Sequence, residues 1–127
     1  QKAVNVLGPD FDIEIVEKHH NQKIDAPSGT ALMLADAMCK EIDHPMKYEY
    51  DRHAKREKRT RDEIGIHSVR GGTIVGEHEI IFAGRDEIIT LSHSARSKEI
   101  FAVGAVNAAV FMCRKDAGLY DMSQMIH

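Results

Sequence analysis

The sequence predicts an α+β domain that contains a mixed sheet with helices on one face. Three observations lead to this fold class: an alternating segment over residues 11–20, a helical stripe behind Pro27, and three strand-like runs between residues 64 and 94. The order strand, helix, loop, three strands, helix is typical of a mixed α+β domain. The length of 127 residues is that of a single domain.

The first predicted strand covers Phe11 to His20. Its apolar residues are Phe11, Ile13 and Ile15, and its charged residues are Asp12, Glu14 and Lys18. This period of two is typical of a strand with one buried face. If the alternation continues to the end of the strand, His19 lies on the apolar face and His20 on the opposite face.

A helix is predicted from Ser28 to Ile42. Pro27 disfavours helical backbone immediately before it, and Ser28 and Thr30 are candidates to cap the first turn. The apolar residues that follow have the spacing of a buried helical stripe: Leu32, Ala35, Cys39 and Ile42. Gly29 in the first turn would let a ligand approach the backbone.

Residues 43–62 have no regular pattern and predict a long loop, which is usually functional or mobile. The stretch from Arg52 to Arg61 contains six Lys or Arg and one Glu, a local charge of +5. Such a run could bind nucleic acid or a cofactor phosphate, although a solvated loop is the more common explanation.

Three strands follow, at Ile64 to Arg70, Thr73 to Ala83 and Glu87 to Ser94, and we expect them to form a meander. Gly71-Gly72 and Gly84-Arg85-Asp86 separate them, and glycines suit turns with positive φ. Both alternating sets of this meander are apolar, as Ile80, Ile81, Ile88 and Ile89 illustrate. Since one covered face needs only one such set, the other face is expected to be used for oligomerisation.

A second helix is predicted from about Lys98 to Arg114, where apolar residues recur at near-helical spacing, and Ala117-Gly118 ends it. The apolar stretch within this helix is too short to span a membrane. A net charge of −3 and a pI near 6.2 disfavour bulk nucleic-acid binding. Cys39 and Cys113 form no spaced framework, so reduced thiols in a cytoplasmic protein are expected.

The densest group of reactive side chains lies between residues 17 and 30. His19 and His20 end a strand, Lys23 lies in the turn, and a helix begins at Ser28-Gly29-Thr30. Free N–H groups and the dipole of a helix start attract anions, so this segment could hold a carboxylate or phosphate beside a histidine that transfers a proton. The alternative is a plain helix cap with a solvated lysine and ordinary polar residues at a strand end.

The other histidines, His67, His78 and His93, lie in strand patterns without a closely spaced Cys/His set. We therefore expect no metal site.

The segment Glu17 to Ala31 resembles the signature of the dihydrodipicolinate reductase family, also called 4-hydroxy-tetrahydrodipicolinate reductase. The family pattern Glu-x-His-His-x-x-Lys-x-Asp-Ala-Pro-Ser-Gly-Thr-Ala is matched at every fixed position. Later segments resemble the family in the same order: Ile64–Gly72, Ile74–His78, Leu91–His93, Phe101–Ala105 and Gly118–Met122.

This resemblance implies an NADH- or NADPH-dependent oxidoreductase of lysine and diaminopimelate biosynthesis that acts on a cyclic dicarboxylate. It implies catalytic roles for His19, as proton donor, and Lys23. It also implies that the substrate contacts His20, Lys23, Ser28, Gly29 and Thr30. Lys98 stands where many members have an Arg near the cofactor, and a lysine lacks the planar fork of that Arg.

The sequence lacks a Gly-x-Gly-x-x-Gly turn between a strand and a helix, the usual dinucleotide fingerprint. Residues 1–127 are therefore expected to be a C-terminal substrate-binding and tetramerisation domain that lacks the N-terminal Rossmann domain and is inactive alone. The resemblance implies a cytoplasmic homotetramer. The competing hypothesis is a non-catalytic dicarboxylate-binding or assembly module.

Overall fold

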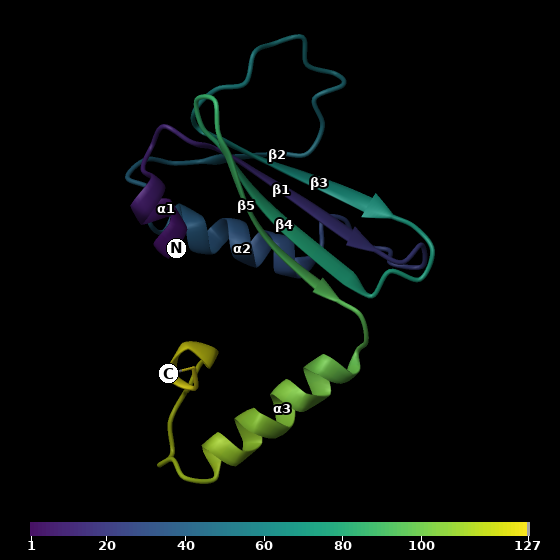
Figure 1. The fold of residues 1–127 in the computed structure, drawn as a ribbon, viewed down its shortest axis with the longest axis vertical. Coiled ribbons are helices and arrows are strands. Elements are labelled where there is room, and N and C mark those ends of the chain that lie inside the picture. Colours follow the sequence, from purple (N-terminus) through teal and green to yellow (C-terminus); the bar gives the residue numbers. More distant parts are fainter. Residues whose placement is uncertain (127) are drawn as a thin grey trace. The chain divides into compact units, whose positions relative to one another are not determined.

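Five strands form one mixed sheet in the computed structural model, which describes residues 1–126 (Figure 1). They are β1 (Asp12–His19), β2 (Lys47–Glu49), β3 (Glu63–Arg70), β4 (Gly76–Ala83) and β5 (Ile88–Ala95). Their spatial order is β2-β3-β1-β4-β5, so the first strand of the chain lies in the middle of the sheet. The predicted α+β class and mixed sheet are confirmed.

The central strand β1 pairs in parallel with β3 and in antiparallel with β4, and Ile15 lies opposite both Ile66 and Ile80. Because β1 separates β3 from β4, the predicted three-strand meander is wrong, and only its last two strands are neighbours. The period-two pattern identifies a strand but carries no information about its neighbours. The long connection after β1 allows β3 to return parallel to it.

The helices are α1 (Lys2–Leu7), α2 (Gly29–Cys39) and α3 (Glu99–Met112), followed by the short 3₁₀ helix η1 (Met122–Gln124). The α2 helix is the one predicted behind Pro27, and it ends three residues before Ile42. Neither α1 nor β2 was predicted, because six and three residues are too few to show a period. The turn after β3 has positive φ at Gly72, as expected, whereas the turn after β4 has it at Asp86 rather than at Gly84.

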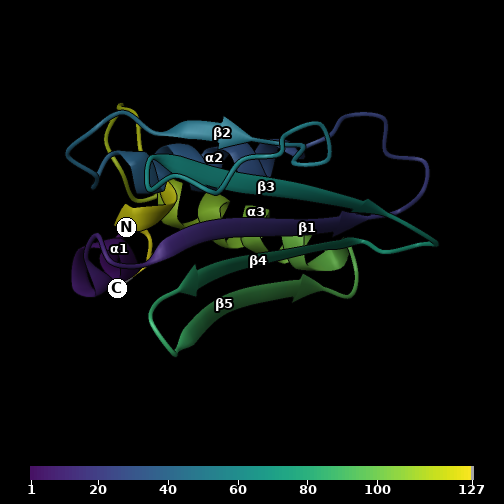
Figure 2. The same cartoon turned by 90° about the horizontal axis from the view of Figure 1, so that it is seen from above.

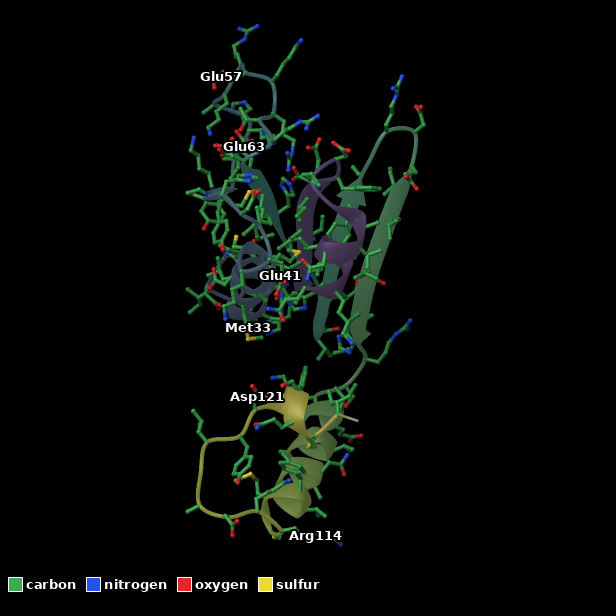
Figure 3. The ribbon with its side chains drawn as sticks, turned by 90° about the vertical axis from the view of Figure 1, so that its left-hand side faces the viewer. Met33, Glu41, Glu57, Glu63, Arg114 and Asp121 are labelled. Carbon is green, nitrogen blue, oxygen red and sulfur yellow. The ribbon has the colours of Figure 1, made fainter. Side chains whose placement is uncertain are left out.

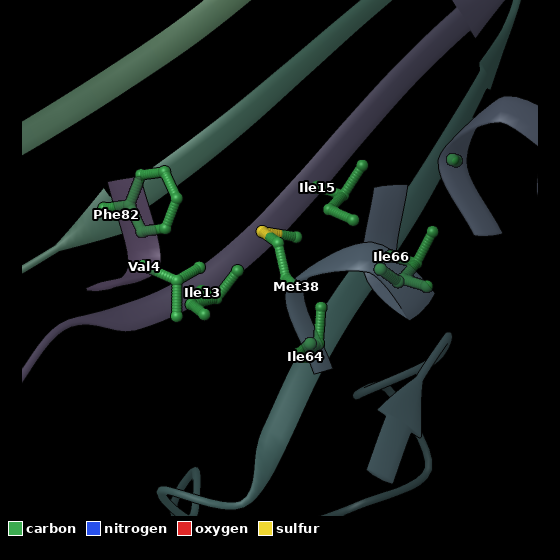
Figure 4. Packing of buried hydrophobic residues seen from close by; sticks show 9 residues of the cluster. Val4, Ile13, Ile15, Met38, Ile64, Ile66 and Phe82 are labelled. Atoms are coloured by element: carbon green, nitrogen blue, oxygen red, sulfur yellow. The ribbon is translucent and has the colours of Figure 1, made fainter. Parts of the chain in front are cut away.

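The core lies between the sheet and α2, with α1 at one end (Figures 2 and 4). Its buried members are Val4, Ile13, Ile15, Ala31, Ala35, Met38, Ile64, Ile66 and Phe82. Two of the three α2 residues in this cluster are alanines, and such small side chains let the helix lie close to the sheet. The close contact positions the first turn of α2 beside the carboxyl end of β1.

Both helices of residues 1–94 pack against the Ile15 side of the sheet, which leaves the opposite side open. We call this side the open face; β1 contributes Glu14, Val16 and Lys18 to it. Its charged groups are paired: the Lys18 ammonium lies 2.8 Å from Glu79, and His67 Nε2 lies 2.6 Å from Glu14 Oε2. Apolar groups are exposed near them, and Ile88 is 70% exposed.

The basic loop over residues 52–61 is anchored at the start of β1. The Arg59 guanidinium donates to Asp12 at 2.8 Å and to the Ile13 carbonyl at 2.9 Å. Glu57 in this loop and Met33 on α2 lie at opposite ends of residues 1–94 (Figure 3). His19 is about 20 Å further along β1 than Ile13, at about 3.3 Å per residue. The basic loop is therefore remote from the helix start.

The chain divides into two compact units, Gln1–Ser94 and a second unit that begins at Ala95. Within the second unit, the Lys115 ammonium lies 4.6 Å from the centre of the Phe111 ring, and the Tyr120 ring meets the same ring edge-on. Helix α3 ends at Met112, two residues before the predicted end. Among residues 1–126, no helix is both long enough and apolar enough to cross a membrane.

Candidate functional site

The predicted reactive segment lies where β1 ends and α2 begins. His19 is the last residue of β1, and its carbonyl accepts a hydrogen bond from the Gly71 N–H at 2.9 Å. A turn then brings the chain back to Ser28, whose extended backbone precedes the first helical residue. The helix start thus faces the strand end from the covered side of the sheet.

A buried carboxylate, Glu17, joins these elements. Glu17 is 0% exposed and continues the covered face of β1 after Ile13 and Ile15. Its Oε1 accepts from the Ser28 N–H (3.0 Å) and from Arg70 Nη2 (2.7 Å). Its Oε2 pairs with His19 Nδ1 (2.6 Å) and accepts from Arg70 Nη1 (2.8 Å). Four hydrogen bonds therefore satisfy a charged group at a position where the pattern predicts an apolar one.

These partners keep Glu17 ionised. Burial alone raises the pKa of the Glu17 carboxyl, but the hydrogen bonds from Arg70 and His19 outweigh burial and lower that pKa from 4.5 to about 2. An ionised carboxylate only accepts hydrogen bonds, so the bond to His19 places a proton on Nδ1. The other ring nitrogen, Nε2, is then the atom of His19 that can exchange a proton with a ligand.

The Nε2 end of His19 lies over Gly76, the first residue of β4. A Cβ atom built at Gly76 would meet Nε2 at 3.2 Å. Because glycine has no Cβ atom, the Nε2 end of the ring is not crowded by this residue. The side chain of His19 is 12% exposed, which leaves limited contact with solvent.

A second histidine, His78, completes the site from β4. Its ring lies edge-on to the His19 ring with centres 5.2 Å apart, and its Nε2 lies 2.9 Å from Ser28 Oγ. Burial and then the neighbouring His19 lower the pKa of His78, so its ring is neutral at pH 7. The Ser28 hydroxyl also accepts the Ala31 N–H at 3.2 Å and so caps α2.

The first turn of α2 retains free donors. Glu17 accepts a hydrogen bond from the Ser28 N–H, and the Ser28 hydroxyl accepts one from the Ala31 N–H. Among residues 1–126, the N–H groups of Gly29 and Thr30 form no hydrogen bond. Both residues are exposed, and a Cβ atom at Gly29 would meet nothing within 4 Å. This helix start can therefore accept an anion through two backbone donors and the helix dipole.

The turn between β1 and α2 brings Lys23 to the same end. The Lys23 N–H donates to the His20 carbonyl at 3.2 Å, and its ammonium is paired with Asp25 at 2.8 Å. Arg70 holds the turn by donating to the Asp25 carbonyl at 2.7 Å. Because β1 ends at His19, His20 lies in the turn and the strand alternation does not fix its direction.

The structure thus gathers most of the predicted site at one end of residues 1–94: His19, His20, Lys23, Ser28, Gly29 and Thr30. Lys98 belongs to the second unit and immediately precedes α3. His67 lies apart, paired with Glu14 on the open face. Across the described residues, no three His, Cys, Asp or Glu side chains gather as metal ligands would.

The sequence analysis assigned no role at the site to three residues that the structure places there: Glu17, Arg70 and His78. The sequence contained one signal for Glu17. The alternation assigns this position to the covered face, where an apolar residue is expected and a carboxylate stands instead. No local pattern identifies Arg70 or His78, because strand pairing across 50 or more residues brings them to the site.

Comparisons with known proteins agree with this architecture. Residues 1–126 match the family model described as "Dihydrodipicolinate reductase, C-terminus". Proteins named 4-hydroxy-tetrahydrodipicolinate reductase are similar: that of Caldanaerobacter subterraneus subsp. tengcongensis is 59% identical over 126 residues, and that of Staphylococcus epidermidis is 59% identical over 125. The alignments cover 99% and 98% of this chain but 50% and 51% of the relatives. The chain thus spans about half the length of the curated relatives it matches.

A solved structure, described as dipicolinate-bound dihydrodipicolinate reductase from Paenisporosarcina sp. TG-14, is also similar. It superposes with a TM-score of 0.72 at 27% sequence identity, and the match covers 98% of this chain and 49% of that one.

The ionised Glu17 makes the stability of the fold depend on pH. Because its folded-state pKa lies below the ordinary value, the unfolded chain takes up the proton first as the pH falls. The contribution of Glu17 is complete above about pH 4.5 and is lost between there and about pH 2. At about 1.4 kcal/mol per pKa unit, it amounts to about 3 kcal/mol.

Chemical unfolding at several pH values checks this expectation. The wild-type chain should lose more free energy of unfolding between pH 4.5 and 2.5 than Glu17→Gln does, whereas the exposed control Glu57→Gln should follow the wild type. Equal slopes for all three proteins would contradict the assigned state of Glu17.

Proposed function

The chain belongs to the dihydrodipicolinate reductase family, and from this membership we propose that it is the substrate-binding and proton-donating part of an oxidoreductase. The reaction is the reduction of 4-hydroxy-tetrahydrodipicolinate to tetrahydrodipicolinate, in which the ring gains a hydride and its 4-hydroxyl group leaves as water, in the biosynthesis of diaminopimelate and lysine. The observation that carries this proposal is the placement of His19 beside a helix start with two free N–H donors. A dipicolinate-bound relative with the same fold supports it.

The anion cradle consists of the Gly29 and Thr30 N–H groups with the Lys23 ammonium. A carboxylate of the cyclic dicarboxylate binds there, and Lys23 exchanges its partner Asp25 for the ligand. His20 and Ser28 lie next to this cradle in the chain and add contacts. His19 then faces the bound ring with Nε2 and delivers the proton from that atom.

Within residues 1–126 no glycine-rich turn joins a strand to a helix start, so these residues do not form a dinucleotide cradle. We propose that NADH or NADPH binds to a separate Rossmann domain, for which the greater length of the relatives leaves room. The nicotinamide supplies hydride to the ring. Residues 1–127 then act as the C-terminal substrate-binding and tetramerisation domain of a cytoplasmic enzyme.

The open face is the surface we assign to assembly into a homotetramer. It combines paired charges with exposed apolar groups such as Ile88, and neither α1 nor α2 covers it. Apolar surface that remains exposed on a sheet face favours association with another copy.

Dicarboxylate binding tests the cradle. Pyridine-2,6-dicarboxylate should bind the chain in titration calorimetry, more weakly as salt increases, because charge contributes to the attraction. Lys23→Ala should lower the affinity about tenfold, the effect of losing one charge-assisted hydrogen bond. The matched control is Lys58→Ala in the remote basic loop, which should bind like the wild type. Equal affinities for the two variants would refute the role of Lys23.

Steady-state kinetics test the proton donor in the enzyme assembled with its cofactor domain. Loss of a general acid lowers turnover by about 10²- to 10⁴-fold, whereas loss of a substrate contact acts more on KM. His19→Gln should therefore depress kcat far more than it changes KM, and His20→Gln should mainly raise KM. The reverse pattern would assign proton donation to His20 instead.

Sedimentation tests the assembly surface. The wild-type chain should sediment as a species larger than its 14.2 kDa monomer at micromolar concentration. Ile88→Asp on the open-face side should shift it to monomer, because a charge opposes burial there. Val6→Asp on α1, which is also highly exposed, should leave the assembly intact. A monomeric wild type would exclude association of the chain. Dissociation by Val6→Asp but not by Ile88→Asp would place the contact between copies on another surface.

A further inference from the structure

Burial of the charged Glu17 side chain at its position in β1 is energetically unfavourable unless partners compensate for it. Its neighbours on the covered face of β1, Ile13 and Ile15, belong to the apolar core, and an apolar side chain would continue their pattern. A buried carboxylate loses its hydration and needs partners for both oxygens. The structure supplies these partners from β1, β3 and the start of α2. Such an arrangement calls for an explanation beyond packing.

The two oxygens of Glu17 serve two different parts of the site. Each receives one Arg70 N–H, and each receives one further group: Oε1 the Ser28 N–H of the helix start, and Oε2 the Nδ1 of His19. One rigid carboxylate therefore sets the position of the helix start that forms the cradle and the position of the proposed proton donor.

We propose that Glu17, held in place by Arg70, is a positioning residue that fixes His19 as the Nδ1-protonated tautomer and directs its Nε2 toward the bound dicarboxylate. This inference rests on the proposed function for its kinetic consequence, but not for the tautomer itself. Arg70 balances the buried charge. Because Nδ1 already carries its proton, Nε2 is the atom that takes up and then donates the transferred proton.

The surroundings of His19 agree with a defined ring orientation. Gly76 leaves open the space beside Nε2, which a Cβ atom would restrict. The His78 ring packs edge-on against the His19 ring from β4, and the Glu17 bond fixes the opposite side. The ring is therefore held on two sides, and Nε2 is the nitrogen left for a ligand.

A purely structural role for the Glu17–Arg70 pair is the alternative. Arg70 also binds the Asp25 carbonyl and so holds the turn before α2. In that case loss of the carboxylate would lower stability and ligand affinity together and leave the chemical step unaffected. The tautomer of His19 and the division of the effect between kcat and KM distinguish the two roles.

The chain contains its own control. His67 pairs with Glu14 through Nε2 rather than Nδ1, so the same reasoning predicts the opposite tautomer for His67. Glu14 lies on the open face, away from the site. Glu14→Gln is therefore a matched partner for Glu17→Gln: each removes the charge of one carboxylate that pairs with one histidine.

The first measurement is nitrogen-15 NMR of the histidine rings at neutral pH. In the wild type we expect His19 to show a protonated Nδ1 and His67 a protonated Nε2. Glu17→Gln should change the His19 pattern and leave His67 as it was, and Glu14→Gln should do the opposite. An Nε2-protonated His19 in the wild type, or a His19 pattern unchanged by Glu17→Gln, would overturn the proposal.

The second measurement is kinetics of the assembled reductase. Partners that orient a metal-bound histidine change activity by about 10- to 100-fold when they are mutated, and we expect a similar factor for a histidine that transfers a proton. Glu17→Gln should lower kcat by that factor with KM changed by less than about threefold. A change in KM and thermal stability without a change in kcat would assign Glu17 a structural role and overturn the proposal.

Glu17→Asp keeps the inference testable if Glu17→Gln does not fold. It retains the charge opposite Arg70 but withdraws the carboxylate by one methylene, so we expect folding with a mixed His19 tautomer and an intermediate kcat. A wild-type His19 tautomer together with a wild-type kcat in Glu17→Asp would overturn the proposal. A wild-type enzyme that does not reduce 4-hydroxy-tetrahydrodipicolinate would refute the proposed function instead, and the NMR measurement would still decide the tautomer.

Discussion

The ion pair between Glu17 and Arg70 constrains the architecture around it. A buried carboxylate needs its counter-charge, and removing one partner of such a pair typically costs about 3–5 kcal/mol. Arg70 reaches Glu17 because β3 runs parallel to β1 in a register that places Arg70 beside His19. A slip of one residue would turn either side chain to the open face. The pair therefore specifies the register of the two central strands, and with it the position of the turn that Arg70 holds.

The central place of β1 explains how so small a unit builds a site with several components. As a middle strand, β1 has β3 on one side and β4 on the other, and each neighbour delivers one residue to the covered face. Arg70 comes from the end of β3 and His78 from the start of β4. Ser28, the N-cap of α2, completes the site from the covered side of the sheet, where its hydroxyl contacts His78. A meander of β3, β4 and β5 would have left β1 without this pair of neighbours.

This dependence on distant pairing also explains what could be predicted from the sequence. The β1 strand, the α2 helix and its Ser28 cap carry local signals, namely a period of two, a helical stripe and a proline. The strand was predicted to within one residue at each end, and the helix to within one residue at its start and three at its end. The sheet order was not, because alternation does not identify neighbours. Arg70 and His78 join the site only through that order. Glu17 was within reach of local reasoning, since it is a charge on the apolar side of an alternating strand.

The alternation of β1 separates two roles within eight residues. On the covered side, Ile13 and Ile15 build the core and Glu17 and His19 build the site. On the open side, Glu14 and Lys18 form ion pairs on the surface that we assign to assembly. The two sets share a single backbone, so a change in strand position on one side must move the other. Contact between copies through the open face would therefore hold the strand that carries His19, the residue that we propose as the proton donor.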